Sequence, residues 1–246
     1  MIYQCTDTAE SFFSAVFDAY KRHETPEKII FTDYQQDLLT EVFSVVPDQE
    51  KAQHVKIAYL KYGGVNALNE LDRALRSCEE DKMTAAFRYV KRTIDQKTDV
   101  SGQLGNADVF RFQDIVARVQ RERHRFTGFL RFIETRSGVY YAHYEPDNDI
   151  TELVAPHFKA RLGTQPFIIH DVKRNKLAFY NGKALFYTTT NQPPTLILSE
   201  DETALQSLWR TYFQNVAVKE RKNTRLQDNF LPRRYRKHMV EFEARP

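Results

Sequence analysis

Apolar residues recur along the chain at two different spacings, and the spacing changes near the middle. In the first half they follow the three- and four-residue spacing of helices with one buried face. The clearest stripe predicts a helix over residues 8–22 and consists of Phe12, Phe13, Val16, Phe17 and Tyr20. Residues 1–5 and 28–31 read as short strands, so the chain is expected to begin as a β-α-β unit.

Residues 47–123 continue the helical spacing. Asp48 is expected to cap a helix that runs to Tyr62 and ends at Gly63-Gly64. Two further apolar stripes follow over residues 68–94, then a loop over 99–106 and a helix over 107–123.

From Phe126 onward apolar residues tend to alternate with polar or small ones, which is typical of strands. Residues 126–134 and 139–145 are predicted to form one hairpin, and residues 167–171 and 176–180 a second. A helix over 150–162 is expected between them, and a third strand over 183–187 follows the turn Asn181-Gly182. Pro193-Pro194 is expected to open a linker or an edge segment, and a helix is expected to begin at Asp201 and run towards Val218, before a basic tail.

The stretch from His124 to Phe132 mixes basic and aromatic residues where the spacing changes. Read as a strand, it would carry Arg125, Thr127 and Arg131 on an outer face. The inner face would hold Phe126, Gly128, Leu130 and Phe132. An apolar face beneath a basic one would make a platform for an anion.

These patterns predict an α+β fold. The N-terminal half is expected to be helical with a small β-α-β start, and the C-terminal half to hold an antiparallel or mixed sheet flanked by helices. We expect a mostly helical region over 1–100 and a basic, sheet-containing domain over 101–246.

Composition excludes several classes of protein. Hydrophobic residues at 41% and aromatic residues at 13% predict a folded core. The two cysteines, Cys5 and Cys78, are too few for a four-cysteine zinc site or a three-cysteine iron–sulfur motif, and we expect two reduced, buried thiols. No signal peptide and no apolar run of about 20 residues is apparent, so we expect a cytoplasmic protein with no membrane partner.

Charge is unevenly distributed although the net charge is only +3. Residues 1–60 hold ten acidic and five basic residues, whereas residues 219–238 hold eight basic and two acidic residues. An acidic beginning and a basic end indicate a polyanion, or an acidic partner surface, at the basic end. An ordinary solvated surface is the plainer alternative.

Basic residues interleaved with aromatic ones predict a nucleic-acid interface, because cations neutralise phosphates and aromatic rings stack on bases. The best candidate is the tail, in which replacing Arg233, Arg234 and Arg236 together is expected to weaken DNA binding. The full set predicted to bind nucleic acid is His124, Arg125, Arg131, Arg161, Lys173, Arg174, Arg221, Lys222, Arg225, Arg233, Arg234 and Tyr235.

Motifs of known enzymes are missing. The chain has no P-loop, no dinucleotide-binding glycine loop and no nucleophile elbow, and we expect no metal and no cofactor. A catalytic role is a hypothesis for His157, His170 and Asp171 as acid and base groups, although histidines of this kind are more often structural. Glu145 and Asp147 could form a carboxylate pair, but Pro146 between them favours a capped turn.

Six motifs occur in an order that resembles a known family. They are His124-Arg125-Phe126 with Gly128-Phe129 and Arg131-Phe132, Glu145-Pro146-Asp147, Ala155-Pro156-His157-Phe158, Ile168-Ile169-His170-Asp171 with Lys173-Arg174, Glu220-Arg221-Lys222-Asn223, and Phe230 with Pro232 and Arg234-Tyr235. This succession resembles the bacterial family of DNA metabolism proteins built around a domain of unknown function. The resemblance covers nearly the whole chain.

The resemblance implies an association rather than a reaction. Members of that family are typically encoded beside a radical-SAM protein thought to modify or repair DNA, and the rear domain is also found fused to uracil-DNA-glycosylase-like domains. Where relatives often carry a tryptophan, this chain has Arg236, which weakens a stacking role there and leaves charge. No catalytic residue is carried over.

Three functions therefore stay open. The first is a nucleic-acid-binding accessory protein in DNA repair or modification that acts with a radical-SAM partner. The second is a nucleic-acid-processing enzyme, a hydrolase or a base-excision enzyme, that uses the histidine and aspartate residues. The third is a protein–protein adaptor that does not contact DNA.

Overall fold

A computed structural model describes residues 1–31, 41–190, 197–216 and 223–242. The chain forms two compact units, an N-terminal unit over Met1–Gln120 and a C-terminal unit over Arg121–Pro246. The domain boundary predicted between residues 100 and 101 stays a prediction.

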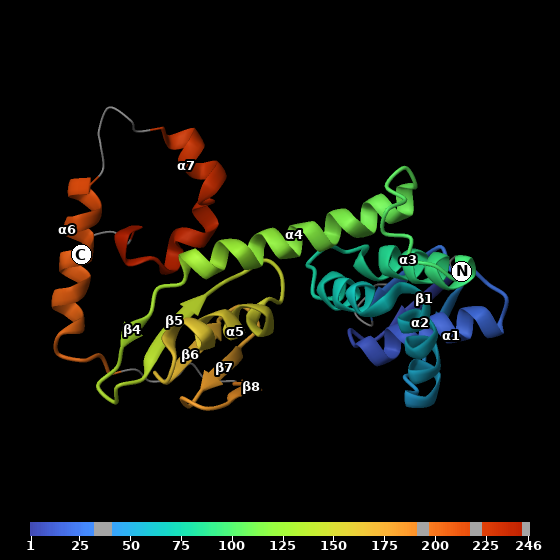
Figure 1. Ribbon diagram of the computed structural model, residues 1–246, viewed down its shortest axis with the longest axis horizontal. Helices are drawn as coiled ribbons and strands as arrows, with labels where there is room; N and C mark the ends of the chain where they lie inside the picture. The colour runs from blue at the N-terminus through green and yellow to red at the C-terminus, as the bar shows by residue number, and fades with distance from the viewer. Residues whose placement is uncertain (32–40, 191–196, 217–222, 243–246) are drawn as a thin grey trace. The chain divides into compact units, whose positions relative to one another are not determined.

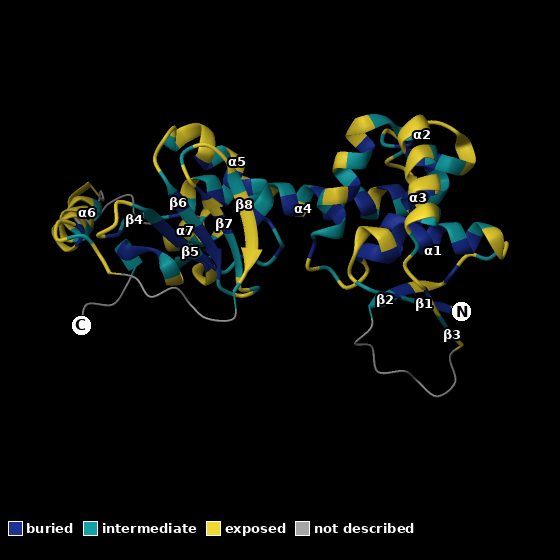
Figure 2. Cartoon of the chain, turned by 90° about the horizontal axis from the view of Figure 1, so that it is seen from below, coloured by how far each residue is buried: buried dark blue, intermediate teal, exposed yellow. Residues whose placement is uncertain are grey.

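The N-terminal unit contains a parallel sheet in the order β2-β1-β3, whose strands are labelled in Figure 2. Its strands are β1 (Ile2–Cys5), β2 (Lys28–Phe31) and β3 (Val42–Ser44), and α1 (Ala9–Lys21) joins the first two. Thr8 begins α1 because its hydroxyl oxygen accepts a hydrogen bond from the Ser11 N–H at 3.1 Å. The predicted β-α-β start is confirmed.

Three further helices contribute to this unit: α2 (Gln49–Leu75), α3 (Lys82–Gln96) and the first part of α4 (Ala107–Phe129). The predicted stop at Gly63-Gly64 is a kink within α2, where Gly64 has φ 78° and ψ −179°. Only glycine adopts this conformation readily, because any side chain would strain the backbone. The apolar stripes face one core, which includes Phe12, Val16, Tyr59, Leu71, Phe87 and Phe112.

The C-terminal unit holds a five-stranded sheet in the order β4-β5-β6-β7-β8 (Figure 1). The strands are β4 (Ile133–Glu134), β5 (Tyr140–Tyr144), β6 (Phe167–Asp171), β7 (Lys176–Tyr180) and β8 (Leu185–Thr189). Only β5 and β6 pair in parallel, and α5 (Thr151–Leu162) connects them. The second predicted hairpin is confirmed, whereas only Ile133 and Glu134 of the strand predicted over 126–134 pair with β5 in the first.

Two side-chain contacts tie α5 to one face of this sheet. The hydroxyl groups of Tyr144 and Thr151 lie 2.9 Å apart, and the Tyr180 hydroxyl donates to the Gly163 carbonyl at 2.8 Å. The turn after β7 is formed by Asn181-Gly182, in which Gly182 has φ 88° and a Cβ would lie 2.7 Å from the Thr164 carbonyl oxygen. Glycine is therefore required there.

Beyond the sheet lie α6 (Glu202–Val216), α7 (Thr224–Phe230) and two 3₁₀ helices, η2 (Arg233–His238) and η3 (Val240–Phe242). Figure 2 shows α6 as largely exposed, in contrast to the buried strands β5 and β6. The linker predicted at Pro193-Pro194 and the continuation towards Val218 fall outside the described residues.

The strand predicted over His124–Phe132 is wrong, because α4 continues to Phe129 and β4 has only two residues. Phe126 and Leu130 are both buried, and a separation of four residues suits a helix as well as an alternating strand. Arg125, Thr127 and Arg131 therefore do not form one face of a strand. Arg131 instead covers the end of α4, where its guanidinium donates to the Gly128 carbonyl at 2.8 Å.

The predicted α+β class is confirmed, with a helical N-terminal half and a mixed sheet flanked by helices in the C-terminal half. Cys5 is buried as expected, but Cys78 is exposed, so the expectation of two buried thiols is wrong for the second. None of the helices in the described ranges is long and apolar enough to cross a membrane.

Candidate nucleic-acid interface

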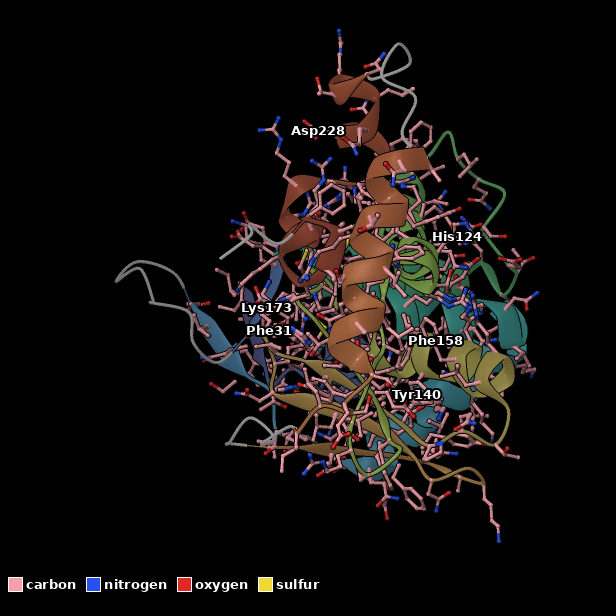
Figure 3. The ribbon with its side chains drawn as sticks, turned by 90° about the vertical axis from the view of Figure 1, so that its left-hand side faces the viewer. Phe31, His124, Tyr140, Phe158, Lys173 and Asp228 are labelled. Carbon is pink, nitrogen blue, oxygen red and sulfur yellow. The ribbon has the colours of Figure 1, made fainter. Side chains whose placement is uncertain are left out.

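A basic surface runs from the end of α4 to α7 in the C-terminal unit. Arg121, His124 and Arg125 share one side of α4, because they are three and four residues apart. The Arg125 guanidinium donates to the Asn229 carbonyl at 3.2 Å and thereby joins α4 to the end of α7. Figure 3 labels His124 and Asp228 on these two elements. We call the surface formed by Arg121, His124, Arg125, Arg225, Phe230 and Arg233 the α4–α7 surface.

Several members of this surface are available to a ligand. Arg121, His124 and Arg225 are exposed, and no acidic side chain in the described ranges lies within salt-bridge distance of them. Phe230 exposes 70% of its surface at the end of α7. Exposed cations beside an exposed aromatic ring are the combination that single-stranded nucleic acid requires.

The arginines of the tail are largely engaged with acids. Arg233 and Arg236 both bind Asp228, at 3.0 and 2.7 Å. The hydrogen bond from Arg233 is the largest cause of the lowered pKa of the Asp228 carboxyl group. Arg234 binds Asp147 at 2.8 Å. Each pair reduces the positive charge that the tail presents to a polyanion, although Arg233 stays exposed.

Tyr235 is an internal anchor, since only 5% of its surface is exposed. Its hydroxyl donates to Glu122 at 2.7 Å and lies 3.0 Å from Asp147, and its ring centroid lies 4.8 Å from that of Phe126. A ring packed in this way has no free face on which a base could stack. Burial, followed by the hydrogen bond to Glu122, raises the pKa of the Tyr235 hydroxyl well above its ordinary value.

Glu122 was not among the residues predicted from the sequence, yet it organises the turn after β5. Its buried carboxylate accepts hydrogen bonds from the Asp147 N–H at 2.7 Å, from the Asn148 N–H at 2.8 Å and from the Asn148 side chain. A signal was present, because Glu122 lies on the same stripe as Ile115, Val119 and Phe126. A carboxylate at a core position requires buried donors.

His170 and Asp171 lie side by side on β6, where successive side chains point to opposite faces of the sheet. His170 is buried, and its Nδ1 lies 2.7 Å from the Tyr141 hydroxyl oxygen. Burial lowers the pKa of the His170 imidazole, and the nearby charge of Asp171 opposes the shift. Burial therefore favours the neutral form of the imidazole.

Asp171 is fully buried and binds Arg174 at 2.8 Å. The same guanidinium donates to the Pro146 carbonyl at 3.1 Å, so the pair fixes the turn at 146–147. Burial raises the pKa of the Asp171 carboxyl group, and Arg174 counteracts the shift. These contacts give Arg174 a structural role, and a catalytic role of His170 and Asp171 stays a hypothesis.

The other predicted residues are dispersed. His157 lies on α5 and packs against the Phe158 ring, and Arg161 is exposed near the end of the same helix. Lys173 is exposed in the turn between β6 and β7 (Figure 3), whereas Arg131 binds Glu241 at 2.6 Å. No hydrogen bond or ring contact among the described residues joins His124, His157 and His170. Arg221 and Lys222 fall outside the described residues.

A pair of histidines was also absent from the sequence-based predictions. His143 on β5 and His238 on η2 pack edge to face with ring centroids 4.4 Å apart. Glu145 lies 2.6 Å from Lys237 and 3.3 Å from His238, and Lys237 is the largest cause of its lowered pKa. In the described ranges, no three His, Cys, Asp or Glu side chains are arranged to hold a metal ion.

Comparison with known proteins supports one assignment. No curated protein matches the chain. The family described as a domain of unknown function, DUF4130, matches residues 80–241, which is more than half of the 246 residues. The matched range includes the five-stranded sheet, the buried Glu122 and Tyr235, and the α4–α7 surface. The chain therefore belongs to the DUF4130 family of domains of unknown function.

Proposed function

We propose that the C-terminal unit binds nucleic acid through the α4–α7 surface. The observation that carries this proposal is the contact of Arg125 with Asn229, which brings the exposed cations of α4 to the exposed ring of Phe230. Cations along such a surface would neutralise phosphates, and Phe230 would stack on an unpaired base. This proposal shifts the emphasis of the sequence-based hypothesis from Arg234 and Tyr235, which are engaged internally, to Arg121 and Arg225.

The biological setting that we propose comes from the family resemblance. The protein would act as an accessory factor in DNA repair or modification, together with a radical-SAM protein that supplies the chemistry. Asp171 is buried and paired with Arg174, and His170 is also buried. This arrangement favours a binding role over the role of a nucleic-acid-processing enzyme that uses these two residues.

The direct test replaces Arg121 and Arg225 together with glutamine and measures affinity for single-stranded DNA by fluorescence anisotropy over a salt series. Removing two phosphate contacts should weaken binding and reduce the slope of log affinity against log salt by about 1.4, because each contact with a single strand contributes about 0.7. The matched control replaces the exposed residues Lys56 and Lys61, which lie on α2 in the N-terminal unit, with glutamine and removes the same charge. Equal losses in both double variants would show that only net charge matters and would refute the proposed surface.

A second function, that of a protein adaptor, is favoured by the exposed apolar side of α6. Leu205, Leu208, Tyr212 and Val216 are all exposed and follow one another at three- and four-residue spacing. We propose that the radical-SAM partner covers this side. Replacing Leu208 and Tyr212 with lysine should abolish co-purification with that partner and leave DNA affinity unchanged, whereas unchanged co-purification would rule out this contact.

A further inference from the structure

A pocket of 560 Å³ opens in the C-terminal unit between the end of α4, the strands β4 and β5, and the start of α6. This volume is in the usual range for sites of small organic ligands. Its walls combine apolar and aromatic side chains with two carboxylates. They are formed by Gly128, Arg131, Phe132, Ile133, Glu134, Tyr140, Glu202, Leu205, Gln206, Trp209 and Val240.

The charge of the pocket is negative, because its only cation is already neutralised. Arg131 binds Glu241 at 2.6 Å, and the side chain of Glu241 is only 2% exposed. The remaining bonds of the Arg131 guanidinium go to backbone carbonyls at the end of α4, including that of Gly128 at 2.8 Å. Arg131 therefore offers little net charge to a ligand.

Glu202 is the residue that determines which ligand fits. It is only 6% exposed, and its carboxylate accepts from the Glu134 N–H at 2.9 Å and from the Gln206 side chain at 2.9 Å. Both donors are neutral, and no described cation lies within salt-bridge distance of Glu202 or Glu134. A buried carboxylate without a countercharge is costly, so a positively charged ligand would relieve the cost.

Aromatic walls complement this charge. Trp209 and Tyr140, the latter labelled in Figure 3, line the pocket together with Phe132. Aromatic side chains attract organic cations through their ring electrons and bury the apolar part of the ligand. The guanidinium of Arg131 already lies 5.7 Å from the centroid of the Trp209 ring, which illustrates that this ring accepts a cation nearby.

We propose that this pocket binds an organic cation with a planar aromatic body, and that Glu202 and Glu134 supply its countercharge. The pocket is distinct from the α4–α7 surface in its chemistry, since its carboxylates would repel phosphate. The proposal is therefore independent of nucleic-acid binding and can fail or succeed separately from it.

The probes are 1-methyladenosine, whose methylated ring is cationic at neutral pH, and adenosine, which has nearly the same shape without the charge. Trp209 is the only tryptophan of the chain, so its emission reports binding in the pocket, and calorimetry on the full chain measures the affinities. We expect 1-methyladenosine to bind at least about tenfold more tightly than adenosine. A hydrogen bond to a charged group usually contributes enough binding free energy to produce a ratio of this size. A DNA oligonucleotide that contains 1-methyladenine then distinguishes a base within a strand from a free nucleoside.

The variants are Glu202→Gln and Glu134→Gln, which keep the shape of the side chain and one acceptor oxygen. Each should reduce the preference for the cation by about tenfold while adenosine binds as before. Glu200→Gln is the matched control, because the Glu200 side chain is 90% exposed and lies two residues from Glu202 outside the pocket. Equal affinity for the two nucleosides, an unchanged preference in both pocket variants, or no binding of either nucleoside at millimolar concentration would overturn the proposal.

Discussion

Replacing Tyr235 with phenylalanine separates an internal anchor from a nucleic-acid contact. The change removes one hydroxyl group and keeps the ring, which packs against Phe126 with centroids 4.8 Å apart. If Tyr235 anchors the tail, the variant should lose stability and bind DNA as the unchanged protein does. If Tyr235 stacks on a base, phenylalanine would preserve the ring and stability would hardly change.

The expected loss follows from the hydrogen bonds of that hydroxyl. It carries one proton, which it donates to Glu122 at 2.7 Å, with Asp147 as the nearby alternative at 3.0 Å. A hydrogen bond to a charged group contributes about 1.5–3 kcal/mol. Glu122 keeps its three donors from Asp147 and Asn148, so the carboxylate stays hydrogen-bonded and the loss should remain within that range.

Urea denaturation followed by Trp209 emission measures this loss, because the only tryptophan of the chain lies in the C-terminal unit. Tyr212→Phe is the matched control, since that residue is exposed and should change the unfolding free energy by less than about 0.5 kcal/mol. A loss in Tyr235→Phe as small as in the control would refute the reasoning about the anchor.

Three further predictions follow from single residues. Arg131→Ala should cost about 3 kcal/mol of unfolding free energy, because it leaves the buried Glu241 carboxylate without its cation, and urea denaturation checks this. Gly64→Ala should cost about 1–3 kcal/mol through backbone strain, whereas Gly102→Ala, at a site with open space and no positive φ, should be tolerated in the same assay. Burial lowers the pKa of His170 in the folded state. The stability that neutral His170 contributes should therefore be complete above about pH 6.5 and be lost as the pH falls through the lowered folded-state pKa. Histidine NMR that finds the His170 ring protonated at or above pH 6.5 would contradict this prediction.

Local patterns predicted most of the elements. The stripe on α1 and the hairpin of β6 and β7 depend on residues close in sequence, and both were predicted within a few residues of their bounds. The stretch 124–132 failed for a physical reason. Its buried residues Phe126 and Leu130 satisfy both a helical and an alternating spacing, and the continuing helix α4 decided between them.

The partners of charged residues could not be predicted in the same way. Arg234 meets Asp147, and Tyr235 meets Glu122, across 87 and 113 positions of the chain. Composition alone describes the tail as a uniformly basic segment, whereas in the fold most of its described cations form ion pairs with acidic residues. Arg225 of the predicted set stays exposed because no such partner reaches it in the described ranges, and the proposed surface adds Arg121 and Phe230, which the predicted set did not include.

The salt dependence of DNA affinity tests the central claim most directly. The α4–α7 surface offers three arginines without an acidic partner in the described ranges, Arg121, Arg125 and Arg225, so log affinity for single-stranded DNA should fall against log salt with a slope of about −2. That slope corresponds to roughly a fifteenfold loss of affinity between 50 and 200 mM salt. An affinity that does not change with salt, or no binding at 50 mM salt, would contradict the proposal that this surface binds nucleic acid.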